Sequence, residues 1–297
     1  MQAFCADVEE AAVTRSFLFV PGDSERKLEK ALAAGADALI VDLEDAVAAE
    51  ARPAARELTR EYVASGDDIW VRINPICSED AAADLEAVMP AAPAGIFLPK
   101  PRNADDVMKL ANMIAEAETR HGLEPGSTLI LPLVTETPQS LFALGSYTGC
   151  SDRLAGMSWG AEDLSAAIGA TRNRDENGDW LPPYELARSL CLFAAAAAEV
   201  PAIDTVFTDF RNAEGLAGYA AEARRDGFSG MLAIHPAQVE AINAAFQPSA
   251  EEIEHAERIV ALFEANPGAG TFGMDGRMID RPHHVQALWI LELAKRQ

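Results

Sequence analysis

Basic side chains are scarce in this chain of 297 residues, in which 24 lysines and arginines accompany 47 aspartates and glutamates. The formal charge of −23 produces an averaged field that repels phosphate polymers, which argues against a nucleic-acid partner. An anionic small-molecule substrate would therefore need a local cluster of basic residues. The balance of 49% hydrophobic and 24% charged residues is that of a folded protein with a sizeable core, and it argues against disorder.

Three further absences narrow the class of protein. The four cysteines, Cys5, Cys77, Cys150 and Cys191, form no CxxC pair and no histidine lies at zinc-ligand spacing, so we expect reduced thiols. The N-terminus carries acids and no long apolar run, which predicts neither a signal peptide nor a membrane span and favours a cytoplasmic protein without a membrane partner. No GxGxxG turn follows the first strand candidate, which argues against a dinucleotide-binding sheet.

Short apolar segments alternate with amphipathic stretches along most of the chain, the pattern of βα units around a parallel sheet. Eight segments predict strands, at 16–20, 38–43, 69–73, 95–99, 128–134, 154–159, 203–207 and 230–234. Helical patterns between them open at Ser or Asn and close at Gly. Eight such units close into one (β/α)8 TIM barrel, and the chain length suits a single barrel of roughly 200 to 300 residues.

Segments outside the eight strand–helix units indicate how the chain divides into domains. Residues 171–185 are rich in turn-forming and charged residues and predict a loop over the barrel mouth. We expect an N-terminal tail at 1–14, the barrel at 15–248 and a C-terminal helical extension at 249–297. Because such an extension must bury its apolar residues, we expect a neighbouring subunit to cover it, and hence a homo-oligomer.

Acidic residues follow two neighbouring strands, at the barrel face where the catalytic groups of such folds lie. Glu136 follows the fifth strand and Asp163 the sixth, an arrangement suited to a hard divalent cation held by carboxylates, substrate oxygens and water. Magnesium is the natural candidate, and manganese is an alternative. Both segments also look like helix starts, so capping of the following helix is the competing interpretation.

Arg72 lies within an otherwise apolar strand, where a permanent cation requires an anionic partner. That partner is either Asp42 or Glu44 in a structural ion pair, or a substrate oxygen that gains charge during reaction. A basic group after the first strand, Arg26 with Lys27 and Lys30, is either a solvated helix face or a site for the phosphates of an anionic ligand.

The segment RSFLFVPGDSERKLEKALAAGADALIVDLEDAV closely resembles the opening of the citrate lyase beta subunit family, within the HpcH/HpaI aldolases. This family includes malyl-CoA and citramalyl-CoA lyases. Further matching segments follow in order, RINP, LPK, ET, WGAEDL, GFSGMLAIHPAQ and GRMIDRP, so that the resemblance covers residues 15–290.

The resemblance implies specific roles for individual residues. Glu136 and Asp163 would hold Mg²⁺, and Arg72 would bind the substrate. Asp280, in the GxMxDxP motif, would enter the active site of an adjacent subunit as the acid–base group. Contacts with the acyl-CoA are implied for Phe19, Arg26, Lys30, Ile234 and His235, with Arg26 at a position where relatives often have lysine. From the residues alone, His235 fits binding or packing better than a role as catalytic base.

The resemblance implies a Mg²⁺-dependent carbon–carbon lyase that cleaves a 3-hydroxyacyl-CoA, such as malyl-CoA or citramalyl-CoA, to acetyl-CoA and a 2-oxo acid. The expected assembly is a trimer or hexamer. A malyl-CoA thioesterase and a malate-synthase-like condensing enzyme are alternatives on the same fold. An aldolase for pyruvate and free aldehydes is disfavoured by the C-terminal motif, and a citrate lyase beta subunit that requires an acyl carrier partner remains open. The acyl group itself is not readable from the sequence.

Overall fold

The computed structural model describes residues 14–66, 68–268 and 270–295. These residues form two compact units, one of Thr14–Asn243 and one that begins at Ala244. All but one residue of the expected N-terminal tail, Cys5 included, lie outside the described residues. The remaining cysteines carry free thiols. None of the described helices combines the length and the apolarity needed to cross a membrane.

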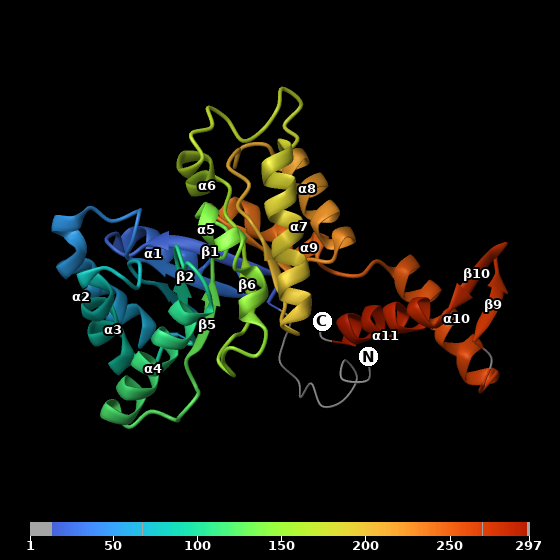
Figure 1. The fold of residues 1–297 in the computed structure, drawn as a ribbon, viewed down its shortest axis with the longest axis horizontal. Helices are drawn as coiled ribbons and strands as arrows, with labels where there is room; N and C mark the ends of the chain where they lie inside the picture. Colours follow the sequence, from blue (N-terminus) through green and yellow to red (C-terminus); the bar gives the residue numbers. More distant parts are fainter. Residues whose placement is uncertain (1–13, 67, 269, 296–297) are drawn as a thin grey trace. The chain divides into compact units, whose positions relative to one another are not determined.

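The first unit is built on eight parallel strands, which confirms the predicted barrel class (Figure 1). The strands are β1 (Ser16–Pro21), β2 (Ala38–Asp42), β3 (Ile69–Arg72), β4 (Gly95–Leu98), β5 (Leu129–Pro132), β6 (Met157–Ser158), β7 (Ala202–Asp204) and β8 (Gly230–Ala233). Continuous pairing runs in the order β5, β4, β3, β2, β1, β8, β7, β6. Isolated bridges, Ile130 with Leu154 and Leu133 with Ser158, join β5 to β6 and close the ring.

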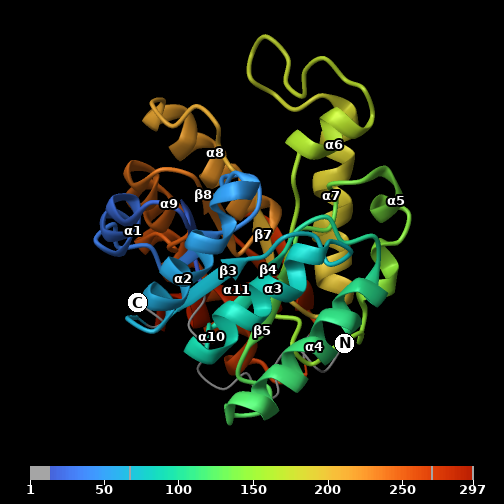
Figure 2. The ribbon, with the colours of Figure 1, turned by 90° about the vertical axis from the view of Figure 1, so that its left-hand side faces the viewer.

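Helices cover the outside of the strands (Figures 1 and 2). The barrel unit contains α1 (Glu25–Leu32), α2 (Arg52–Val63), α3 (Glu79–Val88), α4 (Ala104–His121), α5 (Pro138–Leu141), α6 (Glu162–Ala167), α7 (Pro182–Ala197) and α8 (Ala213–Asp226), while α9 (Val239–Ala245) spans the unit boundary. The predicted start and stop signals operate in α4 and α8. Each has an Asn side chain that accepts a backbone hydrogen bond at its N-terminus and a left-handed Gly at its C-terminus.

Large apolar side chains fill the barrel interior. Phe17, Trp70 and Phe97 lie in one buried cluster with aliphatic residues of neighbouring strands. Gly95 leaves room for the Trp70 indole, because a Cβ at this position would lie 2.2 Å from the ring. Strands buried on both faces read as continuous apolar runs, which is why the sequence identified them.

The irregular insert between α6 and α7 spans 168–181, so it begins and ends earlier than the predicted 171–185. Helix α7 begins at Pro182, and proline suits the first turn of a helix because it has no amide hydrogen to leave unpaired. A single antiparallel bridge between Arg174 and Trp180 closes the loop.

The C-terminal unit contains α10 (Ala250–Ala265), a hairpin of β9 (Thr271–Met274) and β10 (Arg277–Asp280), and α11 (Arg281–Lys295). The hairpin turns at Asp275 and Gly276, both at positive φ, as a tight two-residue turn requires. The sequence predicted the two helices but described the hairpin only as a glycine-rich stretch. Residues of both helices and of the hairpin form a small separate core.

Candidate active site

A cleft of about 340 Å³ lies at the C-terminal ends of the barrel strands. Its walls include residues that end β1, β2 and β3 and residues that follow β5, β6, β7 and β8. Glu136, Asp163 and Arg72 all line it. The three main candidates therefore meet in one cavity, as the strand-end positions predicted, although they lie far apart in the sequence.

Glu136 is a buried carboxylate, with 3% of the residue exposed, and Asp163 is half-buried in the first turn of α6. The Lys100 amide donates to Glu136 Oε2 over 2.5 Å. Burial, and then the negative charge of Asp163, raise the pKa of Glu136 well above its usual range. The surrounding protein therefore offsets only part of the cost of ionising Glu136, and a bound cation would favour its ionised form.

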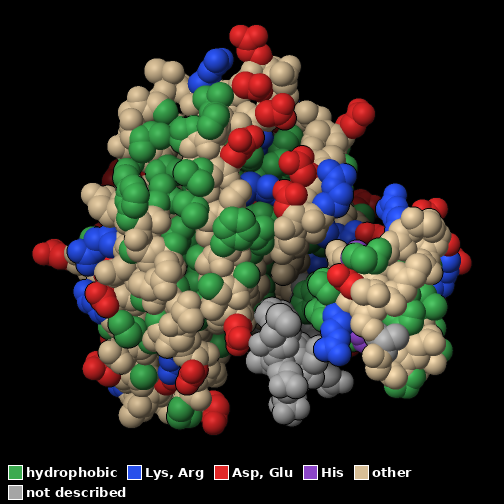
Figure 3. Space-filling model, turned by 45° about the vertical axis from the view of Figure 1, so that its right-hand side comes forward, with side chains coloured by type: hydrophobic (Ala, Val, Ile, Leu, Met, Phe, Trp, Pro, Cys, Tyr) green, Lys and Arg blue, Asp and Glu red, His purple; other side chains and the backbone are tan. Residues whose placement is uncertain are grey.

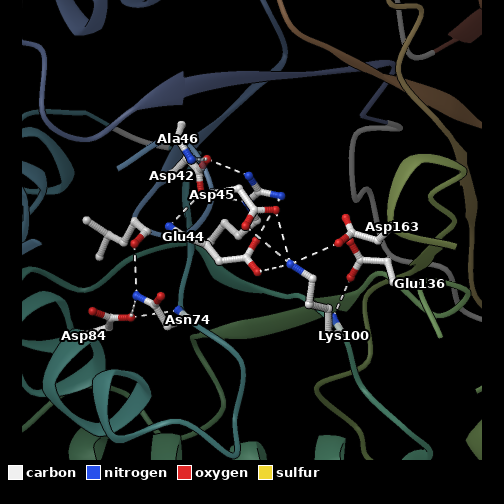
Figure 4. A network of polar contacts seen from close by, with 11 residues as sticks. Asp42, Glu44, Asp45, Ala46, Asn74, Asp84, Lys100, Glu136 and Asp163 are labelled. Atoms are coloured by element: carbon white, nitrogen blue, oxygen red, sulfur yellow. Dashed lines mark hydrogen bonds and ion pairs between the residues drawn. The ribbon is translucent and has the colours of Figure 1, made fainter. Parts of the chain in front are cut away.

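Lys100 is the cation nearest to this acidic pair, and Figure 4 shows its ammonium group between two sets of carboxylates. The Nζ atom lies 2.5 Å from Glu44 Oε1, 3.2 Å from Asp45 Oδ2 and 3.3 Å from Asp163 Oδ1. Its backbone is in the left-handed region, at φ 50°, which is uncommon for a residue with a side chain. From the sequence, Lys100 was noted only as part of the LPK motif and was given no role. Its position directly after β4 was the feature that could have assigned it to this site.

The fit of a divalent cation follows from this donor set. In the described part of the chain, no group of three or more His, Cys, Asp or Glu side chains is arranged to hold a metal alone. Magnesium is commonly held by one or two carboxylates, with water or substrate oxygens completing its shell. Glu136 and Asp163 meet that requirement, and they do so beside a cleft that admits a substrate.

Arg72 pairs with both acidic residues, Asp42 and Glu44, that the sequence offered as structural partners. Its Nε and Nη2 donate to both oxygens of Asp42, over 2.7 and 2.6 Å, and Nη1 lies 3.3 Å from Glu44 Oε2. Burial alone lowers the pKa of Arg72, but the bonds and charge of Asp42 outweigh it and the net pKa is raised. The guanidinium stays charged and also faces the cleft, so a structural ion pair does not exclude contact with a substrate anion.

A second polar network holds Trp159 in the wall of the cleft. Trp159 lines the cleft and donates through Nε1 to Asp204 Oδ1 over 2.6 Å. Asp204 also accepts from Arg188 Nη2 over 2.8 Å. The insert reaches this network, because Trp180 packs edge-on against Trp159 with ring centroids 5.0 Å apart. No pattern in the sequence indicated this network.

The predicted substrate contacts divide into two groups. Phe19 and Ile234 line the cleft, and Arg72 lies over the Phe19 ring at 4.9 Å. Arg26 and Lys30 are exposed on α1 and are not among the lining residues in the described structure. His235 is exposed, accepts the Ala237 amide through Nδ1 and stacks on Phe210 at 4.8 Å.

Asp280 belongs to the C-terminal unit, where it ends β10 immediately before α11. Its Oδ1 lies 2.5 Å from His283 Nδ1, and its backbone amide donates to the same nitrogen over 3.2 Å. The His283 ring therefore contacts both the carboxyl and the amide of Asp280 within the C-terminal unit.

Comparison with known proteins gives consistent relatives. The chain is 35% identical over 287 residues to the citrate lyase subunit beta of Haemophilus influenzae, covering 95% of this chain and 97% of that protein. It is 35% identical over 289 residues to a (3S)-malyl-CoA thioesterase of Cereibacter sphaeroides, covering 95% and 94%. A solved structure of CitE from Mycobacterium tuberculosis, in complex with magnesium, acetoacetate and coenzyme A, matches with a TM-score of 0.81 and 33% identity over 96% of this chain and 99% of that one.

The family model for HpcH/HpaI aldolase/citrate lyase matches residues 15–236. That range covers most of the barrel unit, including Arg72, Glu136 and Asp163. The predicted family resemblance is thus confirmed, and this chain belongs to the HpcH/HpaI aldolase/citrate lyase family.

Proposed function

We propose that this protein is a Mg²⁺-dependent carbon–carbon lyase that cleaves a 3-hydroxyacyl-CoA such as malyl-CoA or citramalyl-CoA. The products are acetyl-CoA and a 2-oxo acid. The observation that carries the proposal is the meeting of Glu136, Asp163 and Arg72 in one cleft. The magnesium and coenzyme A bound by the related CitE structure support the same substrate class.

Glu136 and Asp163 would hold the ion, with Mn²⁺ as a possible replacement. When bound, the ion supplies a Lewis acid that polarises the oxygen destined to become the keto group. Arg72, held rigid by Asp42, would stabilise the enolate oxygen that develops on the thioester as the carbon–carbon bond breaks. Asp280 of an adjacent subunit in a homo-oligomer would then protonate the enolate carbon, or remove that proton in the condensing direction.

The CoA moiety needs local positive charge in a chain whose net charge is −23. Arg26 and Lys30 lie exposed on the helix that follows β1 and would meet its phosphates. Phe19 and Ile234 would contact the acyl end of the substrate, since both line the cleft. His235 would contact the coenzyme near the rim of the cleft.

A thioesterase is the second candidate, favoured by the similarity to the (3S)-malyl-CoA thioesterase. Hydrolysis would release free CoA thiol and a hydroxy acid in place of acetyl-CoA and a keto acid. The two reactions therefore differ in products that are measured separately.

The test is incubation of the purified protein with malyl-CoA and with citramalyl-CoA, in Mg²⁺ or in EDTA. We expect glyoxylate or pyruvate, detected as the phenylhydrazone, without free thiol and only with metal. Free thiol without keto acid would replace the lyase with the thioesterase. Absence of both products would contradict both candidates and favour the carrier-dependent citrate lyase subunit.

A further inference from the structure

The seam between β5 and β6 has the sparsest backbone pairing in the barrel. Strand β6 has two residues, and isolated bridges join it to β5 where the other neighbours share a continuous ladder. Near the cleft, the Val134 amide donates to the Ser158 carbonyl over 2.8 Å. Glu136 and Asp163 follow on the two sides of this same seam.

A side chain makes the next connection toward the cleft. The Gly160 amide donates to Thr135 Oγ1 over 3.0 Å, and Thr135 Oγ1 lies 3.2 Å from the Gly160 carbonyl, to which it donates. One hydroxyl thus uses its acceptor and its donor on a single residue of the facing segment. Thr135 has 0% of its surface exposed, so bulk water does not reach the hydroxyl to replace these hydrogen bonds.

Gly160 is packed against the proposed metal ligand. A Cβ atom at Gly160 would lie 3.4 Å from Glu136 Cγ and 3.4 Å from Leu133 Cδ2. These are ordinary van der Waals distances for an added methyl group, so Gly160 lies beside the Glu136 side chain without crowding it. The Thr135 bonds therefore fix a backbone segment that adjoins Glu136.

We propose that Thr135 is a positioning residue that sets the metal affinity of the site, by holding the ends of β5 and β6 at a fixed separation. The Thr135 hydroxyl replaces a backbone hydrogen bond that β5 and β6 lack at this point. Thr135 lies one residue before Glu136, and its partner Gly160 lies three residues before Asp163. This inference rests on the proposed metal role of Glu136 and Asp163.

The test is Mn²⁺ binding to the full-length protein, measured as free Mn²⁺ by electron paramagnetic resonance. Thr135→Val removes the hydroxyl at nearly constant volume and is expected to weaken binding about 10-fold or more, the usual effect of losing a group that orients a ligand. Thr135→Ser keeps the hydroxyl and is expected to stay within about 2-fold of the parent protein. Thr128→Val is the matched control, since Thr128 Oγ1 is buried at the start of the same segment without a hydrogen-bond partner in the described structure.

A second variant separates loss of the hydroxyl from a change in the facing segment. Gly160→Ala keeps the Thr135 hydroxyl and adds a methyl group at ordinary van der Waals distance from Glu136, so Mn²⁺ binding is expected to stay within about 2-fold of the parent protein. Urea unfolding in EDTA is measured for each variant, so that metal affinity is compared between folded proteins. Equal Mn²⁺ affinity in the parent protein and in Thr135→Val would overturn the inference. A parent protein that binds no Mn²⁺ would instead overturn the proposed function.

Discussion

Arg72 is the residue at which structural and chemical roles meet. Its guanidinium binds both oxygens of Asp42 and faces the cleft. Lysine carries the same charge but has no planar fork for a bidentate contact, so Arg72→Lys removes geometry and retains charge. We expect kcat to fall about 100-fold or more if the guanidinium stabilises the enolate oxygen. The measurement is steady-state kinetics with the acyl-CoA that the protein accepts.

Arg56 provides the matched control for this substitution. It donates to Asp84 over 2.7 Å and to Asp80 over 2.5 Å, and its side chain is 13% exposed, against 14% for Arg72. Arg56→Lys is expected to lower the melting temperature without a comparable fall in kcat. Equal losses of kcat in both variants would assign Arg72 a structural role only.

At the scale of elements, Glu118 near the end of α4 links this helix to the loop before β5 and to the segment before β6. Its carboxylate binds Arg153 and accepts the amides of Gly126 and Thr128. Burial alone raises the pKa of Glu118, but these bonds outweigh it and the net pKa is lowered. A lowered pKa means that its stabilisation is present above the ordinary glutamate pKa of about 4.3 and is lost as pH falls through the folded value.

We therefore expect the unfolding free energy of Glu118→Gln to depend less on pH in acid. Between pH 5 and pH 3 the variant is expected to lose about 1 to 2 kcal/mol less unfolding free energy than the parent protein. At neutral pH the same variant is expected to be less stable, because Arg153 loses its charged partner. Urea unfolding at several pH values measures both effects. A profile parallel to that of the parent would show that other carboxylates dominate acid unfolding.

The eight strands and the cleft positions of Glu136, Asp163 and Arg72 were predictable, because apolar runs and strand ends are local features of the sequence. The length of β6 was predicted wrongly, as 154–159, because its pairing depends on how far β5 and β6 run side by side. The Thr135–Gly160 and Lys100–Glu44 contacts span 25 and 56 residues. Such contacts arise from barrel closure, and no local pattern encodes them.

At the scale of the whole molecule, exposed apolar side chains indicate surfaces suited to another subunit. Figure 3 shows hydrophobic side chains gathered on the visible face of the molecule, and the most exposed large ones in the barrel unit include Phe142, Leu186 and Phe193. The C-terminal unit exposes Met278 and Val285 as well. Burying such side chains is favourable by roughly 25 cal/mol per Å² of apolar surface, which supports the proposed homo-oligomer.

The proposed assembly predicts complementation between two inactive variants. Glu136→Gln impairs the barrel half of a site, and Asp280→Asn impairs the half that an adjacent subunit would contribute. Each variant alone is expected to be inactive, but co-expressed chains that assemble at random would form sites with both halves intact in about a quarter of cases. Activity near that fraction of the parent value, in a species whose mass by light scattering is a multiple of 31.7 kDa, would match the prediction. A mixed assembly without activity would instead place both halves of each site in one chain, because no chain in the mixture carries both residues intact.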